Sequence, residues 1–327
     1  SAKSRRICSN KKDDLIEMIF KEAVNFYPHI ITEGSIIERL KREFNYPLDD
    51  ALSNALMIYD EAGKYLLEKI YREYLDIAES SDLPIMLLTP TWRTNSERTK
   101  IANVDLKTIN TDAFLFVDTI RKSYGSFSEK IFIGGLTGCK GDAYKPEEAL
   151  SENDSYHFHK EQMQILAEAG VDFLFASTLP ALTEAIGIAK AMSETKKDYV
   201  ISFVIRDNGR LLDGTPLTDA IKIIDDSVQT TPLFYLTNCI HPDVLHKSFL
   251  SIKDEDDILK KRLFGIQANA SSKSPEELDT LENLDADSPT NWARGMVDLN
   301  KKYNFKILGG CCGTDARFIS SIVELLK

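Results

Sequence analysis

Eight short runs of apolar residues recur along this 327-residue chain, separated by longer amphipathic or polar stretches. Most of the runs are almost continuously apolar, whereas a strand with one solvated face alternates apolar and polar residues. Continuous apolar runs are typical of parallel strands that are covered on both faces. The strands predicted from them span residues 29–34, 84–90, 130–137, 171–178, 199–206, 232–239, 263–270 and 305–312.

The segments between these runs have the spacing of helices. In the first, apolar and small residues recur mostly every three or four positions, at Leu52, Leu56, Tyr59, Gly63, Leu66, Leu67 and Ile70. The predicted helices include residues 51–79, 158–169, 181–196, 216–228 and 289–303. This alternation favours the α/β class and a (β/α)8 TIM barrel. A doubly wound open sheet stays open as the alternative, because periodicity does not report closure.

The chain contains no linker, repeat or low-complexity segment that would divide it. We expect an N-terminal leader and helix over residues 1–28 and a single barrel domain over residues 29–327. Two long polar connections, 138–157 and 271–288, each follow a predicted strand. In a barrel such connections lie at the C-terminal ends of the strands, where active-site loops are found.

Charge and cysteine content restrict the partners and the compartment. The formal net charge is −11, with acidic residues dispersed along the chain, which argues against nucleic acid or an anionic membrane as a partner. We find no apolar run of the roughly 18 residues needed to span a membrane, and no apolar core of a secretory signal follows residues 1–14. Five cysteines, two of them adjacent, make a poor disulfide framework and fit a reducing compartment. We therefore expect a cytoplasmic protein that binds small molecules; a homo-oligomer is compatible with these features.

Three cysteines occupy the C-terminal ends of predicted strands. Cys239 ends the sixth strand, and Cys311 and Cys312 end the eighth, so barrel closure would place all three on one rim. Three thiolates can hold Zn²⁺ and leave one tetrahedral position open for a substrate thiol. The metal would lower the pKa of that thiol and keep it nucleophilic. We expect Gly309, Gly310 and Gly313 to let the chain bend there.

Two other interpretations of this segment are open. Cysteines at strand ends are usually small buried apolar residues. A strand followed by two glycines and a helix also resembles a phosphate cradle, which would indicate a lyase or isomerase barrel.

Four segments resemble motifs of the homocysteine S-methyltransferase family, which is zinc-dependent and includes betaine– and S-methylmethionine–homocysteine methyltransferases. They are LTNCIHPDVL (236–245), LGGCCGTDARFI (308–319), RDNGRLLDGTPL (206–217) and QANASSKSPEE (267–277). Trp292 falls where the family has a tryptophan in its last long helix. The resemblance implies zinc on Cys239, Cys311 and Cys312. It also implies methyl transfer to homocysteine, which yields methionine, with S-methylmethionine or S-adenosylmethionine favoured as the donor.

The resemblance also implies a set of substrate-binding residues. These are Glu33 and Gly34 in place of the family's Asp-Gly pair, Thr89, Asn238, Asn269 and Ser177. Ser177 departs from the family, because Ser-Thr-Leu-Pro (177–180) stands where a Glu-Thr-x-Pro motif holds the substrate ammonium. The chain therefore lacks one charge-assisted contact, for which Glu33 could substitute. The alternative is a divergent barrel with another thiol substrate or without methyltransferase activity.

The remaining cysteines, histidines and acidic residues have ordinary interpretations. Cys139 lies on the same rim and is interpreted as a bystander, and Cys8 as a surface thiol. His157 and His159 are expected in a polar loop before a helix. His241 is a conceivable fourth ligand, but a capping role is favoured. The acidic run 254–257 is interpreted as a solvated face.

Overall fold

The computed structural model describes residues 18–252, 257–274, 277 and 285–327. Eight parallel strands form a closed barrel in the order β1 to β8. Closure is made where β1 pairs with β8, with Ile30 opposite Ile307. The barrel prediction is thus confirmed, and the open sheet is excluded. Seven strands lie within their predicted runs, and β4 extends one residue beyond the run 171–178. The strands are β1 Ile30–Thr32, β2 Ile85–Leu88, β3 Ile131–Thr137, β4 Phe173–Leu179, β5 Tyr199–Val204, β6 Phe234–Asn238, β7 Leu263–Ala268 and β8 Ile307–Gly310.

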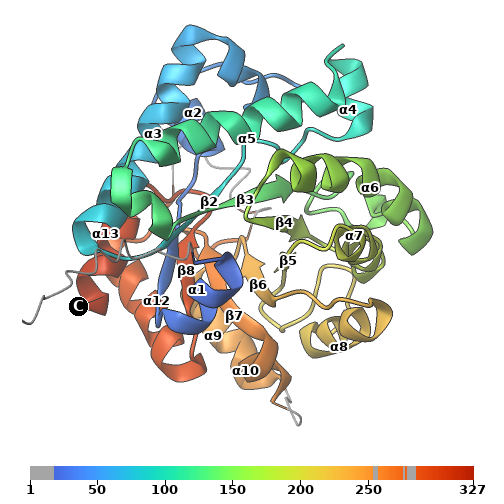
Figure 1. Cartoon of the computed structure of the whole chain (residues 1–327). Helices are drawn as coiled ribbons and strands as arrows, with labels where there is room; N and C mark the ends of the chain where they lie inside the picture. Colours follow the sequence, from blue (N-terminus) through green and yellow to red (C-terminus); the bar gives the residue numbers. More distant parts are fainter. Residues whose placement is uncertain (1–17, 253–256, 275–276, 278–284) are drawn as a thin grey trace, which may run out of the picture.

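Helices surround the barrel (Figure 1). The longer ones of the outer ring are α3 Glu61–Ser81, α5 Leu106–Lys122, α6 Glu152–Ala169, α7 Leu182–Glu194, α8 Leu217–Ser227, α9 Pro242–Ser251, α12 Pro289–Tyr303 and α13 Ala316–Leu326. The shorter elements are α1 Phe20–Phe26, α2 Ile37–Arg42, η1 Ala55–Tyr59, α4 Ser96–Ile101, η2 Gly125–Lys130, η3 Pro146–Glu148 and α10 Ile258–Arg262. None of the helices in the described part of the chain has the length and apolar character needed to cross a membrane.

Two helix starts differ from the sequence prediction, and side-chain caps explain both. The predicted helix 51–79 is interrupted, because Asp60 accepts a hydrogen bond from Gly63 N and begins α3 at Glu61. In α6 the Ser151 hydroxyl accepts from Asp154 N, so the helix begins at Glu152, six residues before the predicted start at 158. The end of the predicted polar loop 138–157 is therefore helical.

The barrel interior is apolar at one end and polar at the other. Its apolar layers come from the N-terminal parts of the strands and include Ile30, Met86, Phe132, Phe173, Phe234 and Ile307. The helix α1 closes this end: its Phe20 ring stacks on Phe173 with the ring centroids 4.0 Å apart. Figure 1 shows α1, in blue, across the centre of the strand ring. Nearer the C-terminal ends, buried polar side chains replace apolar ones, among them Thr32, Ser202, Asn238 and Gln267. Only this second end is left for a polar site.

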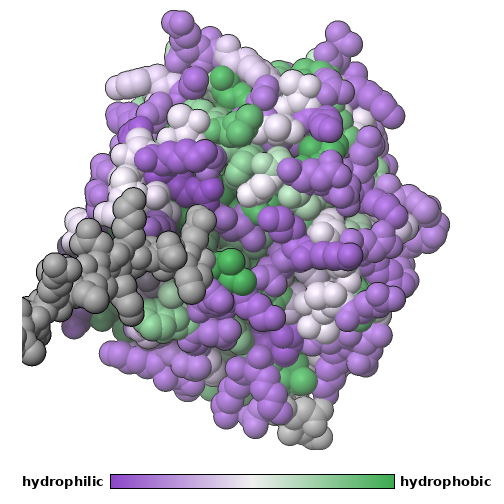
Figure 2. Space-filling view, viewed as in Figure 1, coloured by the Kyte–Doolittle hydropathy of each residue, from purple (hydrophilic) through white to green (hydrophobic). Residues whose placement is uncertain are grey.

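The face seen in Figure 2 is mainly hydrophilic, with apolar side chains in small separate areas. The hydrophilic surface agrees with the formal net charge of the chain, which is −11. The exposed apolar residues lie on different elements, for example Phe26 on α1 and Leu250 on α9.

Candidate active site

Three sulfur atoms meet at the C-terminal rim of the barrel. Cys239 follows β6 directly, and Cys311 and Cys312 follow β8. The Sγ atom of Cys239 lies 3.2 Å from that of Cys311, which lies 4.0 Å from that of Cys312. All three sulfurs lie within 4.8 Å of one another, and the thiols are free. Barrel closure has brought together side chains that are more than seventy positions apart in sequence.

The backbone at Cys239 turns sharply out of the strand. Its φ of +57° lies in the left-handed region, which non-glycine residues seldom adopt. The peptide is held there because Cys239 N donates to Gln267 O at 3.2 Å. The next turn ends at His241, whose Nδ1 accepts from Asp243 N and caps α9. The unusual conformation directs the sulfur toward β8, and strained positions of this kind cluster at functional sites.

The glycines around the paired cysteines act differently from the sequence expectation. A Cβ atom on Gly309 would lie 1.8 Å from Thr32 Oγ1, and one on Gly310 would lie 2.1 Å from Thr314 Oγ1. These two glycines are in β8 and permit close approach rather than bending. Only Gly313, with φ +79°, provides a left-handed turn. The expectation that all three bend the chain was wrong for Gly309 and Gly310, because both continue the strand.

The turn after β8 is not a phosphate cradle. All five backbone N–H groups of residues 310–314 already donate to protein acceptors. These acceptors are the carbonyls of Glu33, Ala268 and Cys311, the side-chain oxygen of Asn269 and the carboxylate of Glu38. An anion would find no free amide and would meet a carboxylate instead, which excludes this alternative.

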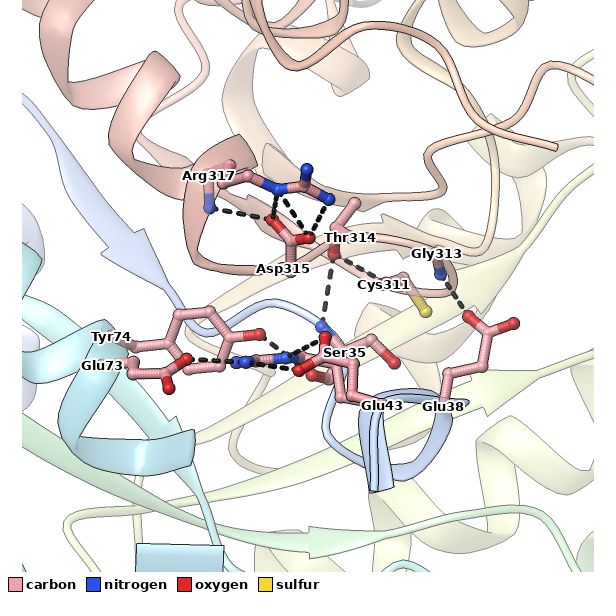
Figure 3. A network of polar contacts seen from close by, with 11 residues as sticks. Ser35, Glu38, Glu43, Glu73, Tyr74, Cys311, Gly313, Thr314, Asp315 and Arg317 are labelled. Carbon is pink, nitrogen blue, oxygen red and sulfur yellow. Dashed lines mark hydrogen bonds and ion pairs between the residues drawn. The ribbon is translucent and has the colours of Figure 1, made fainter. Parts of the chain in front are cut away.

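Contacts from the N-terminal part of the chain hold the cysteine turn (Figure 3). The Thr314 hydroxyl donates to Cys311 O at 2.7 Å and accepts from Ser35 N at 3.2 Å. Glu38 on α2 accepts from Gly313 N. On the outer side, Asp315 caps α13 and binds Arg317. The turn is thus clamped between α2 and α13.

Two asparagines predicted to bind substrate lie behind the cysteines. Asn238 is only 1% exposed; its Nδ2 donates to Cys239 Sγ at 3.0 Å, and its Oδ1 accepts from Ser202 Oγ at 2.6 Å. Asn269 Oδ1 accepts from Cys312 N at 3.2 Å, and Asn269 O accepts from Trp292 Nε1. These bonds orient the cysteines, while neither asparagine lines the cavity described next.

A cavity of about 280 Å³ opens onto the three sulfurs. Its lining includes the cysteines and the predicted residues Glu33, Gly34, Thr89 and Ser177. Sequence reasoning missed other lining residues, including Glu38, Tyr71, Trp92, Ala143 and Tyr144. The described lining contains two carboxylates and no lysine, arginine or histidine. The cavity is therefore acidic and partly aromatic.

Glu33 is the most deeply buried carboxyl group of the cavity. It is 6% exposed, and its Oε2 accepts from Leu88 N at 2.9 Å. Burial raises the pKa of Glu33 to about 8, and the hydrogen bond from Leu88 only partly opposes this. A buried carboxyl group with a raised pKa in a cleft is typical of a functional site.

Ser177 reaches the cavity through an irregularity in β4. The register between β4 and β5 shifts between Ala176 and Leu179, and Thr178 has φ +58°. Thr178 Oγ1 accepts from Trp92 Nε1 at 2.9 Å. The bulge turns Ser177 into the cavity, where it offers a hydroxyl group instead of a charge. The Thr89 hydroxyl, also in the lining, is bonded to Leu136 N and Thr91 Oγ1.

Tyr144 contacts the cysteine group from the β3–α6 loop, residues 138–151. A hydrogen bond from its hydroxyl helps to lower the pKa of Cys239, after the larger effect of hydrogen bonds from Cys311 and Cys312. The pKa of Cys311 and of Cys312 is raised, mainly because each thiol donates a hydrogen bond to the Cys239 sulfur. No sequence motif around Tyr144 indicated a role in the site. Trp92 lies close to the C-terminal end of a predicted strand, where barrel active sites are found, and could have been proposed on that ground.

The other residues considered from sequence lie outside this group. Cys139 is buried, and burial raises its pKa to about 12, as expected of a bystander. His157 and His159 lie inside α6, not in a loop, because Ser151 starts the helix early. The described metal-binding group contains only the three cysteines. Cys8 and residues 254–256 of the acidic run lie outside the described residues.

Comparisons with known proteins agree with this geometry. A family model described as homocysteine S-methyltransferase matches residues 30–326. The chain is 24% identical over 316 residues to the homocysteine S-methyltransferase YbgG of Bacillus subtilis, covering 90% of this chain and 94% of that protein. It is also similar to the metallated form of the homocysteine methyltransferase MmuM from Escherichia coli. The TM-score is 0.72 at 17% identity, over 92% of this chain and 98% of the other, and this likeness shows the fold alone.

Proposed function

Because the chain belongs to the homocysteine S-methyltransferase family, we propose that it transfers a methyl group from a sulfonium donor to homocysteine, giving methionine, and that it depends on zinc. The observation that carries the proposal is the convergence of Cys239, Cys311 and Cys312 on a cavity. Membership of a methyltransferase family and a cavity lined by three cysteines both support methyl transfer to a thiol.

The donor set fits zinc. Three sulfurs within 4.8 Å of one another can surround an ion that binds thiolate at about 2.3 Å. Three protein ligands leave the open position of a catalytic site. When bound, zinc would lower the pKa of the substrate thiol so that its sulfur is a nucleophile at neutral pH. Free thiols of this kind also support a reducing compartment such as the cytoplasm.

The chain's own residues would bind and orient the substrates. The Glu33 carboxyl group faces the cavity beside the cysteine turn and would accept hydrogen bonds from the homocysteine ammonium. Asn238 and Asn269 hold Cys239 and Cys312 in place. The Tyr144 and Trp92 side chains would exclude water from the reacting atoms.

The charge of the cavity favours sulfonium donors. S-methylmethionine and S-adenosylmethionine carry a sulfonium, an ammonium and a carboxylate, hence a net positive charge, whereas betaine is neutral overall. The cavity presents Glu33, Glu38 and aromatic side chains without a basic residue to receive a carboxylate. Carboxylates and aromatic faces attract cations. We therefore favour S-methylmethionine or S-adenosylmethionine.

A second candidate is a divergent barrel that uses another thiol. Ser177 favours it, because the cavity has one carboxylate fewer than the family motif would provide. A thiol without an ammonium group would not need that carboxylate.

The test is methyl transfer by purified, zinc-loaded protein. Homocysteine is offered with S-methylmethionine, S-adenosylmethionine or betaine, and methionine is measured by mass spectrometry. We expect close to one zinc ion per chain and methionine from a sulfonium donor, because there is one group of three sulfurs. Cys311→Ser should lose both bound zinc and activity, while the matched control Cys139→Ser should keep both. Stoichiometric zinc without methionine from any donor would favour the divergent barrel.

A further inference from the structure

The β3–α6 loop forms one wall of the cavity. Its residues Ala143 and Tyr144 line the cavity, and Tyr144 contacts Cys239. The loop has little regular structure beyond the short η3 turn. The position of Tyr144 therefore depends on contacts made elsewhere along the loop.

A single buried carboxylate joins the two ends of this loop. Glu184 lies in the first turn of α7 and is 0% exposed. Its Oε1 accepts from Lys140 N at 2.7 Å, and its Oε2 accepts from Leu150 N at 3.3 Å. His159 on α6 donates to the same carboxylate, with Nε2 at 3.1 Å from Oε1. The described contacts of the Glu184 carboxylate are thus two loop amides and one histidine.

This arrangement differs from an ordinary structural ion pair. Full burial of a carboxylate is unfavourable unless its oxygens receive hydrogen bonds. Among the described residues, the neighbouring imidazole has no hydrogen-bond partner at Nδ1, and its Nε2 bonds to Glu184. Glu184 itself does not line the cavity, and it touches the site only through the loop.

Arg93 also binds the β3–α6 loop, through carbonyl groups that precede Tyr144. Its guanidinium donates to Cys139 O at 3.1 Å and to Gly141 O at 2.8 Å. The same group stacks on the Trp92 ring at 4.0 Å. Because the Arg93 contacts lie before Tyr144, they do not replace the tie that Glu184 makes to Leu150 beyond it.

We propose that Glu184, supported by His159, is a positioning residue of the methyl-transfer site: it ties both ends of the β3–α6 loop and so holds Tyr144 against Cys239. The kinetic part of this inference rests on the proposed function. Its structural part concerns access to the cysteines and does not depend on any methyl transfer.

The first experiment compares Glu184→Gln with Asp172→Asn. A glutamine can still accept from Lys140 N, but its amide nitrogen cannot accept from Leu150 N, so one end of the loop is released. Asp172 accepts from Ile133 N at the opposite end of β3, away from the cavity, and is the matched control. In metal-free protein we expect Cys239 to react faster with a chromogenic disulfide reagent in Glu184→Gln and at the wild-type rate in Asp172→Asn.

The second experiment measures kinetics in zinc-loaded protein. We expect kcat/KM to fall about tenfold in Glu184→Gln, as for other residues that orient a metal site from behind its ligands. In a Tyr144→Phe background the same substitution should have little additional effect, because both changes disturb the same contact. His159→Leu should lower kcat/KM as Glu184→Gln does. His159→Gln keeps a hydrogen-bond donor and should retain the wild-type kcat/KM. If Glu184→Gln does not fold, the comparison of these two His159 variants tests the positioning role.

The outcomes separate the two proposals. Wild-type protein that transfers no methyl group contradicts the proposed function and leaves the labelling rates to decide the role of Glu184. Equal labelling of wild type and Glu184→Gln, or an undiminished effect of Glu184→Gln in the Tyr144→Phe background, would overturn the positioning role.

Discussion

Glu33 shows how a residue proposed to bind substrate can also carry a cost in stability. Its carboxyl group is buried in the cavity wall, and burial raises its pKa to about 8. The bond from Leu88 N is too weak an opposing effect to keep it ionised at neutral pH. An ammonium group in the cavity would stabilise the ionised form. The same desolvation that destabilises the empty protein would therefore favour a cationic group in the proposed site.

Replacement of Glu33 by Gln should change the pH dependence of stability. Below about pH 4.5 the carboxyl group is protonated in both states and has no effect. Between pH 4.5 and about 8 the unfolded chain loses the proton while the folded protein keeps it, so wild-type stability falls as the pH rises. We expect the Tm of Glu33→Gln minus that of wild type to grow between pH 5 and 8. Thermal unfolding at pH 5, 6.5 and 8 measures it, and the exposed Glu61→Gln should show no such trend. A constant difference would contradict a raised pKa.

Ser177→Glu should restore a charged contact with homocysteine. Ser177 lines the cavity, and a carboxylate there could receive the substrate ammonium. A charge-assisted hydrogen bond contributes about 1.5 kcal/mol or more, so we expect the KM for homocysteine to fall about tenfold. The KM for 3-mercaptopropionate, a thiol without an ammonium group, should not fall. A parallel decrease for both thiols would show that the new carboxylate acts in another way.

At the scale of elements, the strands place the chemistry and the segments after them complete it. Cysteines follow directly after β6 and β8, and the β4 bulge places Ser177 in the cavity lining. The turns after β2 and β3 add Trp92 and Tyr144. At the opposite end of the barrel the described residues form an apolar layer, and α1 closes this end with Phe20 packed into the layer. Stability and function thus occupy opposite ends of the same strands.

This separation gives a prediction for α1. Phe20→Ala removes a buried ring from the closed end and should lower the free energy of unfolding by about 3 kcal/mol. Activity in the folded protein should be unchanged, because Phe20 does not line the cavity. Phe26, on the same helix but 69% exposed, is the matched control and should tolerate alanine. Chemical denaturation gives the stabilities; an equal loss for both variants would exclude the role of α1 in closing the barrel.

At the scale of the whole molecule, the sulfur group links β8 to β6 across the intervening strand β7. A metal bound there should stabilise the closed barrel, since it binds the folded state in preference to the unfolded one. At free zinc a hundredfold above its dissociation constant, we expect about 2.7 kcal/mol of added stability.

Calorimetry before and after chelation measures this effect, and added zinc should reverse the loss. Cys239→Ser should show a much smaller response to zinc. A Tm of the wild type that does not respond to zinc would argue against a metal shared by these strands.

Much of this protein could be predicted from local pattern. Strand runs and their order are visible because apolar periodicity is a property of neighbouring residues. Seven strands lie inside the predicted runs, and β4 passes the end of its run by one residue, at Leu179. The rim position of Cys239, Cys311 and Cys312 followed from the general rule for barrel strand ends. The boundaries of α3 and α6 did not follow, because the side-chain caps made by Asp60 and Ser151 override periodicity at helix ends.

The arrangement of the side chains around the rim could not be predicted from local pattern. The amino-acid pattern established eight strands alternating with helices and placed three cysteines at strand ends, because both features depend on contiguous residues. Closure of the strands into a barrel was settled by the pairing of β1 with β8. The sulfur separations, the tight fit of Gly309 against Thr32 and the raised pKa of Glu33 depend on atoms contributed by distant strands. The contact of Tyr144 with Cys239 depends on a loop whose ends are tied by Glu184. Burial and proximity arise when the chain closes, so no local pattern contains them.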